Sequence, residues 1–345
     1  EDGIRDCLLS RGLGDVYKRQ ALVDVTFQID DEFSKKIEGQ GIPKGAMTLI
    51  DKDDQNGLIE ALTALGKSAE KACGGSSTNS VVAASLFGST CYMTCIVGDD
   101  ENGRFYLEDL SLNDVNHSSS LIESEIPSGQ CLVMISEDAE RTMCTNLGIN
   151  SEFSIDNVDE EVIKNSKFLF LEGYLIASPG GFESYKKAIN LAKVHDTKVA
   201  ISLSDPFIVS SFKEQIKELI NIKCDLIFCN EDEAKEFAES NEEEEIFGYF
   251  KKYTDNLLVT KGPKGCTGYD QNGQINVSGI EVNAIDTNGA GDMFAGAVLN
   301  GINESKTLEE SAHFGCFAAS KTVQNSGPRL AKEEYLEIKE TFSSN

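Results

Sequence analysis

The chain has 345 residues, with 58 acidic against 31 basic side chains and a formal net charge of -27. This acidity argues against nucleic-acid or membrane partners, which need basic patches, and no apolar run approaches the roughly 20 residues of a membrane span. A phosphate bound by such a protein must be held locally, by backbone N–H groups, a metal ion, or a few placed lysines and arginines.

The cysteines and histidines indicate neither a disulfide framework nor a metal centre. The ten cysteines include no C-x-x-C pair. The three histidines, His117, His195 and His313, lack metal-ligand spacing. With no secretory segment in the sequence, we expect reduced, buried thiols in a cytoplasmic protein, and the sequence leaves both monomer and homodimer open.

Residues 1–20 show neither a strand period nor a helix period. Basic residues are mixed there with isolated glycines. We therefore expect a leader that is foreign to the fold, with the working domain beginning at about residue 21.

Residues 21–29 (ALVDVTFQI) predict a strand that carries Asp24 inside an apolar run. A buried aspartate needs partners, so Asp24 either faces a ligand or forms a turn at the strand end. A short strand at 45–50 and a helix over 53–65 follow.

Gly74 and Gly75 precede a helix of small residues that contains Asn79. The spacing invites a nucleotide-loop interpretation, but the G-x-G-x-x-G pattern is absent. Gly66-Lys67-Ser68 also lacks the glycine that a Walker A loop needs at position 61, where the chain has alanine. A flexible helix start capped by serine or threonine is the alternative.

After residue 90 the sequence predicts one strand and one helix, then a β-rich stretch, and then strands and helices that alternate regularly. The strand is expected at 91–97, the helix at 103–111, and a hairpin within 117–145. From residue 168 strands and helices alternate, which is typical of a parallel sheet sandwiched by helices. The expected segments are 168–171, 181–193, 198–203, 212–219, 226–229, 231–239 and 257–259. The acidic run 242–245 predicts a solvated loop or helix edge.

Polar residues follow the carboxyl ends of these strands, where ligands bind in such sheets. They are Glu172-Gly173-Tyr174, Ser204-Asp205-Pro206-Phe207, Asn230-Glu231-Asp232-Glu233 and Thr260-Lys261-Gly262.

Residues 286–292 (DTNGAGD) predict a glycine turn that opens a buried helix, with Asp292 in its first turn. Free N–H groups and the helix dipole make this place a natural anion site. A carboxylate there stays ionised and can act as a base on a bound hydroxyl. A plain helix start with an acidic first turn is the alternative.

Three motifs together resemble the ribokinase-like (PfkB) family of carbohydrate and nucleoside kinases, closest to its adenosine-kinase-like branch. They are D-T-N-G-A-G-D at 286–292, Gly74-Gly75 with Asn79, and the N-x-x-E motif from Asn230 to Glu233. The resemblance implies a doubly wound α/β domain over about 21–335, with a mostly parallel sheet, helices on both faces and a C-terminal tail at 336–345. It also implies a small β-sheet lid from about 21–50 and 113–147.

The resemblance assigns the catalytic roles to the motif at 286–292 and to the lid. Asp292 resembles the base that takes the proton of the acceptor hydroxyl. The backbone of Asn288, Gly289, Ala290 and Gly291 would form the anion hole, and Arg141 matches a lid arginine that approaches the phosphates.

The resemblance also implies positions for substrate, ATP and metal. Asp24, Gly75 and Asn79 match positions that hold ribose hydroxyls, Gly74-Gly75 match the lid hinge, and Tyr174 and Phe207 lie where relatives place rings against a purine. Thr260, Gly262, Gly315 and Cys316 would line the ATP site. Asn230 and Glu233 would place Mg²⁺ through water, and Asp286 and Thr287 lie where relatives contribute to a potassium site.

One departure concerns the start of the domain. Relatives have an apolar strand ending in Gly-Asn directly before A-L-V-D, whereas this chain has Asp15-Val-Tyr-Lys-Arg-Gln20. We therefore expect the first core strand, and an asparagine that contacts ribose, to be lost.

The expected function is ATP-dependent phosphorylation of a nucleoside such as adenosine. Phe207 follows a proline, and an aromatic residue there is as often loop packing as a purine contact. Ribokinase or fructokinase activity, or a non-catalytic nucleoside-binding protein on the same fold, therefore stay as alternatives.

Overall fold

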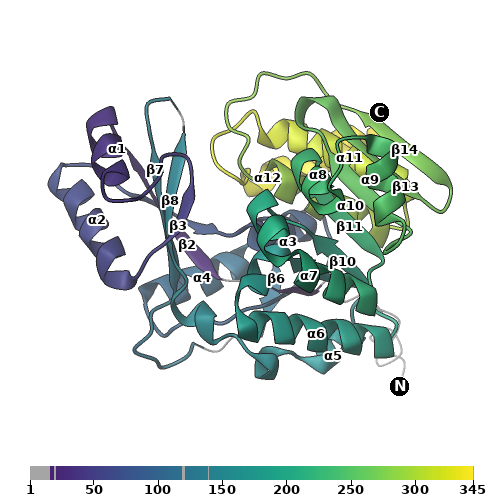
Figure 1. Cartoon of the computed structure of the whole chain (residues 1–345), viewed down its shortest axis with the longest axis horizontal. Helices are drawn as coiled ribbons and strands as arrows, with labels where there is room; N and C mark the ends of the chain where they lie inside the picture. Colours follow the sequence, from purple (N-terminus) through teal and green to yellow (C-terminus); the bar gives the residue numbers. More distant parts are fainter. Residues whose placement is uncertain (1–15, 19–20, 119–120, 139, 345) are drawn as a thin grey trace.

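The computed structural model describes residues 16–18, 21–118, 121–138 and 140–344, which form two sheets and their covering helices (Figure 1). Nine strands of the described chain form the larger sheet. Their order is β14 (Gly273–Ser278), β13 (Gly265–Asp270), β12 (Leu257–Thr260), β11 (Leu226–Asn230), β10 (Lys198–Ser202), β9 (Phe168–Glu172), β1 (Val16–Lys18), β5 (Cys91–Thr94) and β6 (Val115–His117). All pairs are parallel except β12–β13 and β13–β14, so the predicted doubly wound, mostly parallel sheet is confirmed.

β1 corrects the expectation that residues 1–20 contain no strand and that the first core strand is lost. Its backbone pairs in parallel with β5 on one side and β9 on the other, with Val16 opposite both Tyr92 and Leu169. Main-chain groups make the bonds of a sheet, so a segment without a recognisable side-chain pattern can still fill a central position. Residues 1–15, 19 and 20, the remainder of the expected leader, lie outside the described residues.

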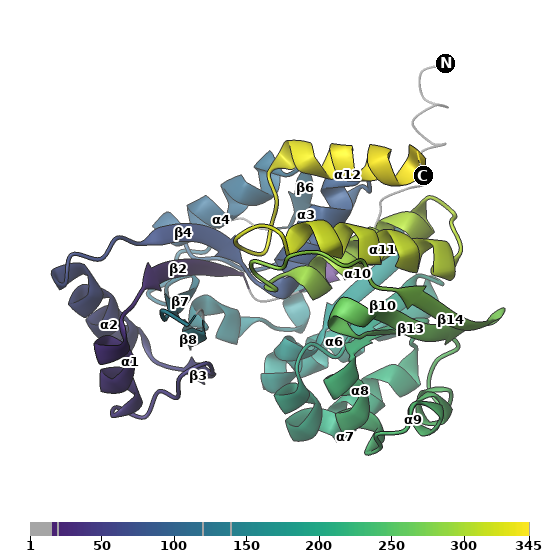
Figure 2. The same cartoon turned by 90° about the horizontal axis from the view of Figure 1, so that it is seen from above.

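Helices cover both faces of the larger sheet (Figures 1 and 2). In β9, Phe168 and Phe170 join the core on one face, and Leu169 and Leu171 join the core on the other. This is why the strand reads as a continuous apolar run rather than as an alternating one. The first face carries α3 (Ser76–Leu86), α4 (Glu101–Leu112), α10 (Ala290–Asn303), α11 (Leu308–Thr322) and α12 (Lys332–Ser344). The second carries α5 (Glu160–Lys164), α6 (Pro179–Val194), α7 (Pro206–Ile222), α8 (Glu231–Ala238) and α9 (Glu243–Phe250).

A five-stranded sheet lies to one side of this body, at the left of Figure 1. Its order is β3 (Met47–Leu49), β8 (Arg141–Asn146), β7 (Gly129–Ile135), β2 (Leu22–Gln28) and β4 (Glu70–Gly74). Helices α1 (Asp31–Glu38) and α2 (Lys52–Ala64) bury Phe33, Ile37 and Leu62 in its own small core. The sheet therefore includes β4, which lies outside both expected lid segments, whereas β6 lies inside one of them but pairs in the larger sheet.

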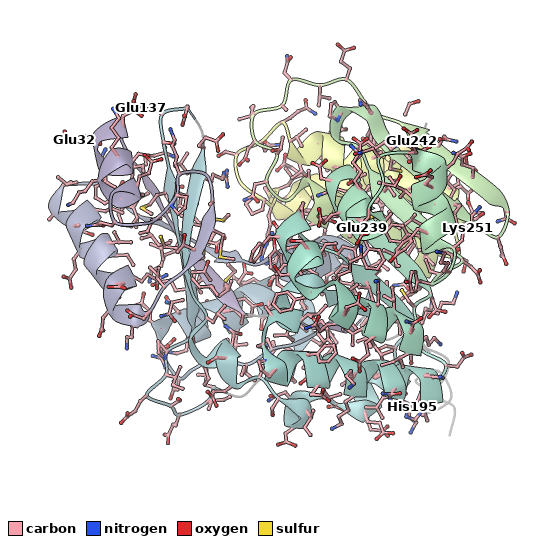
Figure 3. All side chains as sticks on the ribbon, viewed as in Figure 1. Glu32, Glu137, His195, Glu239, Glu242 and Lys251 are labelled. Atoms are coloured by element: carbon pink, nitrogen blue, oxygen red, sulfur yellow. The ribbon has the colours of Figure 1, made fainter. Side chains whose placement is uncertain are left out.

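Two further predictions concern the acidic run and the C-terminal end of the domain. The acidic run 242–245 opens α9, where carboxylates favour the helix dipole, so the helix-edge interpretation is confirmed. The expected domain end at 335 falls inside α12, which buries Tyr335 and Ile338. The acidic side chains labelled in Figure 3, Glu32, Glu137, Glu239 and Glu242, are all exposed. No helix in the described ranges combines the length and apolarity that a membrane crossing requires.

Candidate active site

The turn formed by residues 286–292 has one position, 289, where the backbone accepts only glycine. Gly289 has φ 75° and caps α10. A Cβ atom on Gly289 would lie 2.4 Å from the carbonyl oxygen of Pro328, so both its backbone conformation and its surroundings exclude a larger residue. Within the turn Thr287 and Asn288 are exposed, and Asp292 lies in the first turn of α10. The backbone N–H groups that open α10 therefore lie at the end of the helix that favours anions.

Asp292 is held by side chains from the start of α3. Asn79 donates from Nδ2 to Asp292 Oδ2 at 2.7 Å, and the Ser76 hydroxyl donates to Asp292 Oδ1. These partners lie more than 200 positions away in the sequence. Asp292 therefore does more than provide a favourable charge at a helix start, because two helices position its carboxylate.

The paired glycines let the second sheet meet α3 at close range. Gly75 has φ 96° and caps α3, which explains glycine there. A Cβ atom on Gly74 would lie 2.1 Å from Oδ1 of Asp24, so the Asp24 carboxylate rests directly on the Gly74 backbone. The structure thus brings Asp24, Gly74 and Gly75 together where β2 begins, β4 ends and α3 begins, and Asn79 lies near the start of α3.

The strand-end carboxylates form a second part of the site. Glu172, which is 1% exposed at the end of β9, also lies within hydrogen-bond distance of the Ser76 hydroxyl, whose single hydrogen is shared between the Glu172 and Asp292 carboxylates. Burial above all, together with the nearby Asp205 and Glu172 carboxylates, raises the pKa of Glu233 to about 7, although the hydrogen bond from the Asn230 backbone acts in the opposite direction. Neither Ser76 nor Glu172 received a role from the sequence motifs.

Asn230 and Glu233 form a capping box at the start of α8. Glu233 accepts from the Asn230 backbone N–H at 3.0 Å and from Asn230 Nδ2 at 2.7 Å, while its own N–H donates to Asn230 Oδ1 at 2.8 Å. The N-x-x-E pattern thus has a local structural role. No group of three or more His, Cys, Asp or Glu in the described residues has the geometry to hold a metal ion.

Arg141 connects the second sheet to the turn before α10. It lies at the start of β8 and forms an ion pair with Asp286. The same carboxylate accepts from the Asn288 N–H at 3.0 Å and from the Gly327 N–H at 2.8 Å. Asp286, expected at a potassium site together with Thr287, therefore already carries a cationic partner.

The residues expected at the ATP site lie on two parts of the fold: the end of β12 with the turn after it, and α11, which packs against α10. Thr260 ends β12, and Gly262 follows it with φ 55° in an exposed turn. Gly315 lies in α11, where a Cβ atom would come within 2.7 Å of the Phe294 ring, so its contact is with α10. Cys316 is half-buried, and its interaction with the Cys266 thiol lowers its pKa.

The two aromatic candidates differ in exposure. Phe207 begins α7 and is 67% exposed, so its ring does not fill a hydrophobic core. Tyr174 lies in a short 3₁₀ helix, is half-buried, and places its hydroxyl 3.5 Å from the Ser204 carbonyl oxygen. The loop-packing interpretation of Phe207 is therefore not supported.

Sequence reasoning missed the segment that follows α11. The Gly327 N–H donates a hydrogen bond to the Asp286 carboxylate, and Pro328 packs against the backbone of Gly289. Arg329 donates from Nε to Asn79 Oδ1 at 2.8 Å. The Gly-Pro pair predicts a turn, but no local pattern shows that the turn lies against residues 286–292.

The chain is similar in sequence and in fold to known proteins. Adenosine kinase 2 of Arabidopsis thaliana is 26% identical over 334 residues, which cover 89% of this chain and 92% of that protein. Guanosine-inosine kinase of Escherichia coli K12 is 26% identical over 257 residues, covering 71% of this chain and 57% of that protein. Relatives of this kind span most of the chain.

Two solved structures superpose closely. The adenosine kinase from Sinorhizobium meliloti has a TM-score of 0.86 at 26% identity and covers 95% of this chain and 99% of its own. The probable sugar kinase from Rhizobium etli CFN 42 has a TM-score of 0.86 at 26% identity, with 95% and 98% covered. The fold is thus the ribokinase-like one.

A family model described as "pfkB family carbohydrate kinase" matches residues 45–334. That range contains β4, the turn at 286–292 and nearly all of the larger sheet. The chain therefore belongs to the pfkB family of carbohydrate kinases and is a phosphotransferase that acts on a hydroxyl group.

Proposed function

We propose that the protein transfers the γ-phosphoryl group of ATP to the 5'-hydroxyl of a nucleoside such as adenosine. The observation that carries the proposal is Asp292, held by Asn79 and Ser76 at the start of α10 beside the Asp24–Gly74 contact. In this proposal the base Asp292, the anion site at residues 288–291 and the candidate ribose ligands Asp24 and Asn79 surround one substrate site.

In this proposal Asp292 accepts the proton of the acceptor hydroxyl, and the backbone from Asn288 to Gly291 stabilises the charge of the transferring group. Phosphoryl transfer needs mostly positioning and charge stabilisation, and both follow from a rigid glycine turn on a buried helix. Arg141 adds positive charge when it exchanges its Asp286 partner for a phosphate oxygen.

The ATP and metal ligands are proposed from position and donor chemistry. Thr260, Gly262, Gly315 and Cys316 would border ATP. Asn230 and Glu233 offer oxygen atoms suited to Mg²⁺ through water, and the raised pKa of Glu233 fits a site that a cation would complete. Bound Mg²⁺ would neutralise phosphate charge. Asp286 and Thr287 would take part in a potassium site after Arg141 has left Asp286.

The five-stranded sheet is proposed as the lid, with Gly74-Gly75 as its hinge. The Arg141–Asp286 pair joins this sheet to the turn before α10, and α4 also touches β2 and β4. The kinase domain proposed from the sequence, about 21–335, then includes both sheets except for β1.

A nucleoside acceptor is favoured by the exposed Phe207 ring and the half-buried Tyr174 ring near the strand ends. Stacking of a base on an aromatic ring contributes about 1–3 kcal/mol. The similarity to named adenosine kinases supports this choice, and the similarity to a probable sugar kinase keeps a sugar acceptor as the alternative.

The test is an ADP-release assay with Mg-ATP, potassium, and separately adenosine, inosine, guanosine, ribose and fructose. ADP released only with a nucleoside supports the proposal, and ADP released only with a sugar selects the alternative. Nucleoside binding without turnover would indicate a non-catalytic binding protein.

A further inference from the structure

A guanidinium group lies on the far side of Asn79 from Asp292. Arg329 donates from Nε to Asn79 Oδ1 at 2.8 Å and from Nη1 to Asp109 Oδ2 at 2.7 Å. Its side chain is 15% exposed, so this contact is mostly shielded from water. We propose that Arg329 is a positioning residue for Asp292 that acts through the Asn79 amide; this inference rests on the proposed role of Asp292 as the base.

The hydrogen-bond chemistry of the three side chains fixes the orientation of Asn79. A guanidinium group only donates hydrogen bonds, and a carboxylate only accepts them. Asn79 therefore satisfies both neighbours in one orientation, with Oδ1 toward Arg329 and Nδ2 toward Asp292. Without Arg329 the amide loses the partner that selects this orientation, and Asp292 loses a fixed donor.

Arg329 is itself held firmly enough to impose that orientation. The Asp109 carboxylate on α4 forms an ion pair with it at 2.7 Å. Burial lowers the pKa of Arg329, but the charge and hydrogen bond of Asp109, together with smaller contributions from Cys73 and Tyr106, offset this effect and the pKa is raised overall. The preceding residues are anchored too, since Gly327 bonds Asp286 and Pro328 lies against Gly289. Asp109, Arg329, Asn79 and Asp292 thus form one continuous chain of contacts.

If Arg329 had only a structural role, its substitution would have a different effect on catalysis, and Lys332 provides a control for this alternative. Lys332 ties the same segment to the end of α4, through the Asp114 carboxylate at 2.7 Å and the Leu112 carbonyl oxygen at 2.9 Å. These contacts of Lys332 do not involve Asp109, Arg329, Asn79 or Asp292. If Arg329 only anchors the segment, Lys332→Met and Arg329→Met should have similar effects.

The first experiment compares the steady-state kinetics of Arg329→Met, Arg329→Lys and Lys332→Met with those of the unsubstituted protein. We expect kcat of Arg329→Met to fall about 100-fold, the scale of a misplaced reacting group, with an unchanged KM for ATP. Arg329→Lys should recover part of the loss, because an ammonium group can still donate to Asn79 but lacks the fork that also reaches Asp109. Lys332→Met should keep kcat. Unchanged kcat in Arg329→Met, or an equal fall in Lys332→Met, would overturn the proposal.

The second experiment does not depend on activity. The side-chain amide NMR signals of Asn79, assigned by their loss in Asn79→Asp, should shift in Arg329→Met and stay in place in Lys332→Met. Unmoved signals in Arg329→Met contradict the inference even if the protein is an active nucleoside kinase. If no acceptor is phosphorylated, the proposed function fails, while shifted signals still support the Arg329–Asn79 contact. Should Arg329→Met fail to fold, Arg329→Lys is compared in the same two measurements, and wild-type values in both would refute the inference.

Discussion

At the scale of single residues, the candidate site depends on close backbone approaches as much as on charged groups. Gly74 lets the Asp24 carboxylate lie on the main chain, and Gly289 lets Pro328 cover the anion turn. Glycine at each position is therefore explained by what a Cβ atom would displace. The role of these contacts can therefore be tested by replacing glycine with alanine, which adds only a Cβ atom.

Gly74→Ala should weaken nucleoside binding while leaving the fold intact. The added Cβ would lie 2.1 Å from Asp24 Oδ1, so the carboxylate proposed to hold ribose must move. We expect the dissociation constant for adenosine, measured by calorimetry, to rise by roughly tenfold, equivalent to about 1.4 kcal/mol.

The control for Gly74→Ala is Gly57→Ala in α2, where a Cβ atom would have no neighbour within 4 Å. Alanine there should leave adenosine affinity unchanged and stabilise the helix by up to about 1 kcal/mol. Equal affinities for Gly74→Ala and the unsubstituted protein would contradict the Asp24 assignment.

Glu233 should make stability depend on pH between its ordinary pKa and its folded-state pKa. Burial raises that pKa from 4.5 to about 7, so the folded protein binds the proton more tightly than the unfolded chain does. The resulting stabilisation is complete below pH 4.5 and is lost as the pH rises through 7. Relative to Glu233→Gln, the unsubstituted protein should lose up to about 3 kcal/mol of unfolding free energy between pH 4.5 and 8.

Glu310 provides the control, because it forms the same kind of capping box with Thr307 in α11 but is exposed. The Thr307 backbone bond lowers the pKa of Glu310, so its titration ends below the tested range. Denaturant melts at several pH values should show a slope for the Glu233→Gln difference and none for Glu310→Gln. A flat Glu233 difference would mean that Glu233 is not destabilised by burial.

At the scale of elements, the sequence predicts best where both faces of a strand are buried. β9, β10, β11 and β12 give apolar runs, and the helices between them have apolar stripes, so their alternation is visible in the sequence. β4 was missed because three of its five residues are exposed, and β1 because sheet pairing there follows no side-chain pattern.

The contacts of the site were predicted less completely than its motifs. Local motifs marked Asp292 and Asn79 separately, and the resemblance to a family assigned their roles. The Arg329–Asn79 bond joins residues 250 positions apart, and no short pattern encodes such a pairing. Long-range partners of a motif are therefore what the structure adds.

The ion pair between β8 and the turn before α10 should matter more for catalysis than for stability. Arg141 and Asp286 are 26% and 11% exposed at their side chains, and such a partly exposed pair contributes roughly 1 kcal/mol or less. If Arg141 also stabilises phosphoryl charge, Arg141→Gln should lower kcat by about 10²–10³-fold and change the melting temperature little.

The control is Lys44→Gln, which removes the ion pair of Lys44 with Asp138 in the second sheet and leaves Arg141 in place. Its kcat and melting temperature should both stay close to those of the unsubstituted protein. A large fall in melting temperature with normal kcat for Arg141→Gln would show that the pair is only structural.

At the scale of the whole molecule, the two sheets divide the expected tasks. The larger sheet and its helices position the turn at 286–292 and the strand-end carboxylates, and the smaller sheet brings Asp24 and Arg141 to them. The chain carries a formal net charge of -27, whereas the proposed anion site would use backbone N–H groups and few basic residues. This division fits a kinase whose acceptor is small.

The most direct test of the account measures adenosine-dependent ADP release by the unsubstituted protein and by Asp292→Asn. A general base contributes about 10²–10⁴-fold, so kcat of the variant should fall at least about a hundredfold, with ATP affinity nearly unchanged. Asparagine has nearly the same size, and its side chain can accept from Asn79 Nδ2 through the amide oxygen and donate to the Ser76 hydroxyl oxygen through the NH2 group, so the fold should survive. Near-normal turnover by Asp292→Asn, or no nucleoside-dependent ADP release by the unsubstituted protein, would contradict the account.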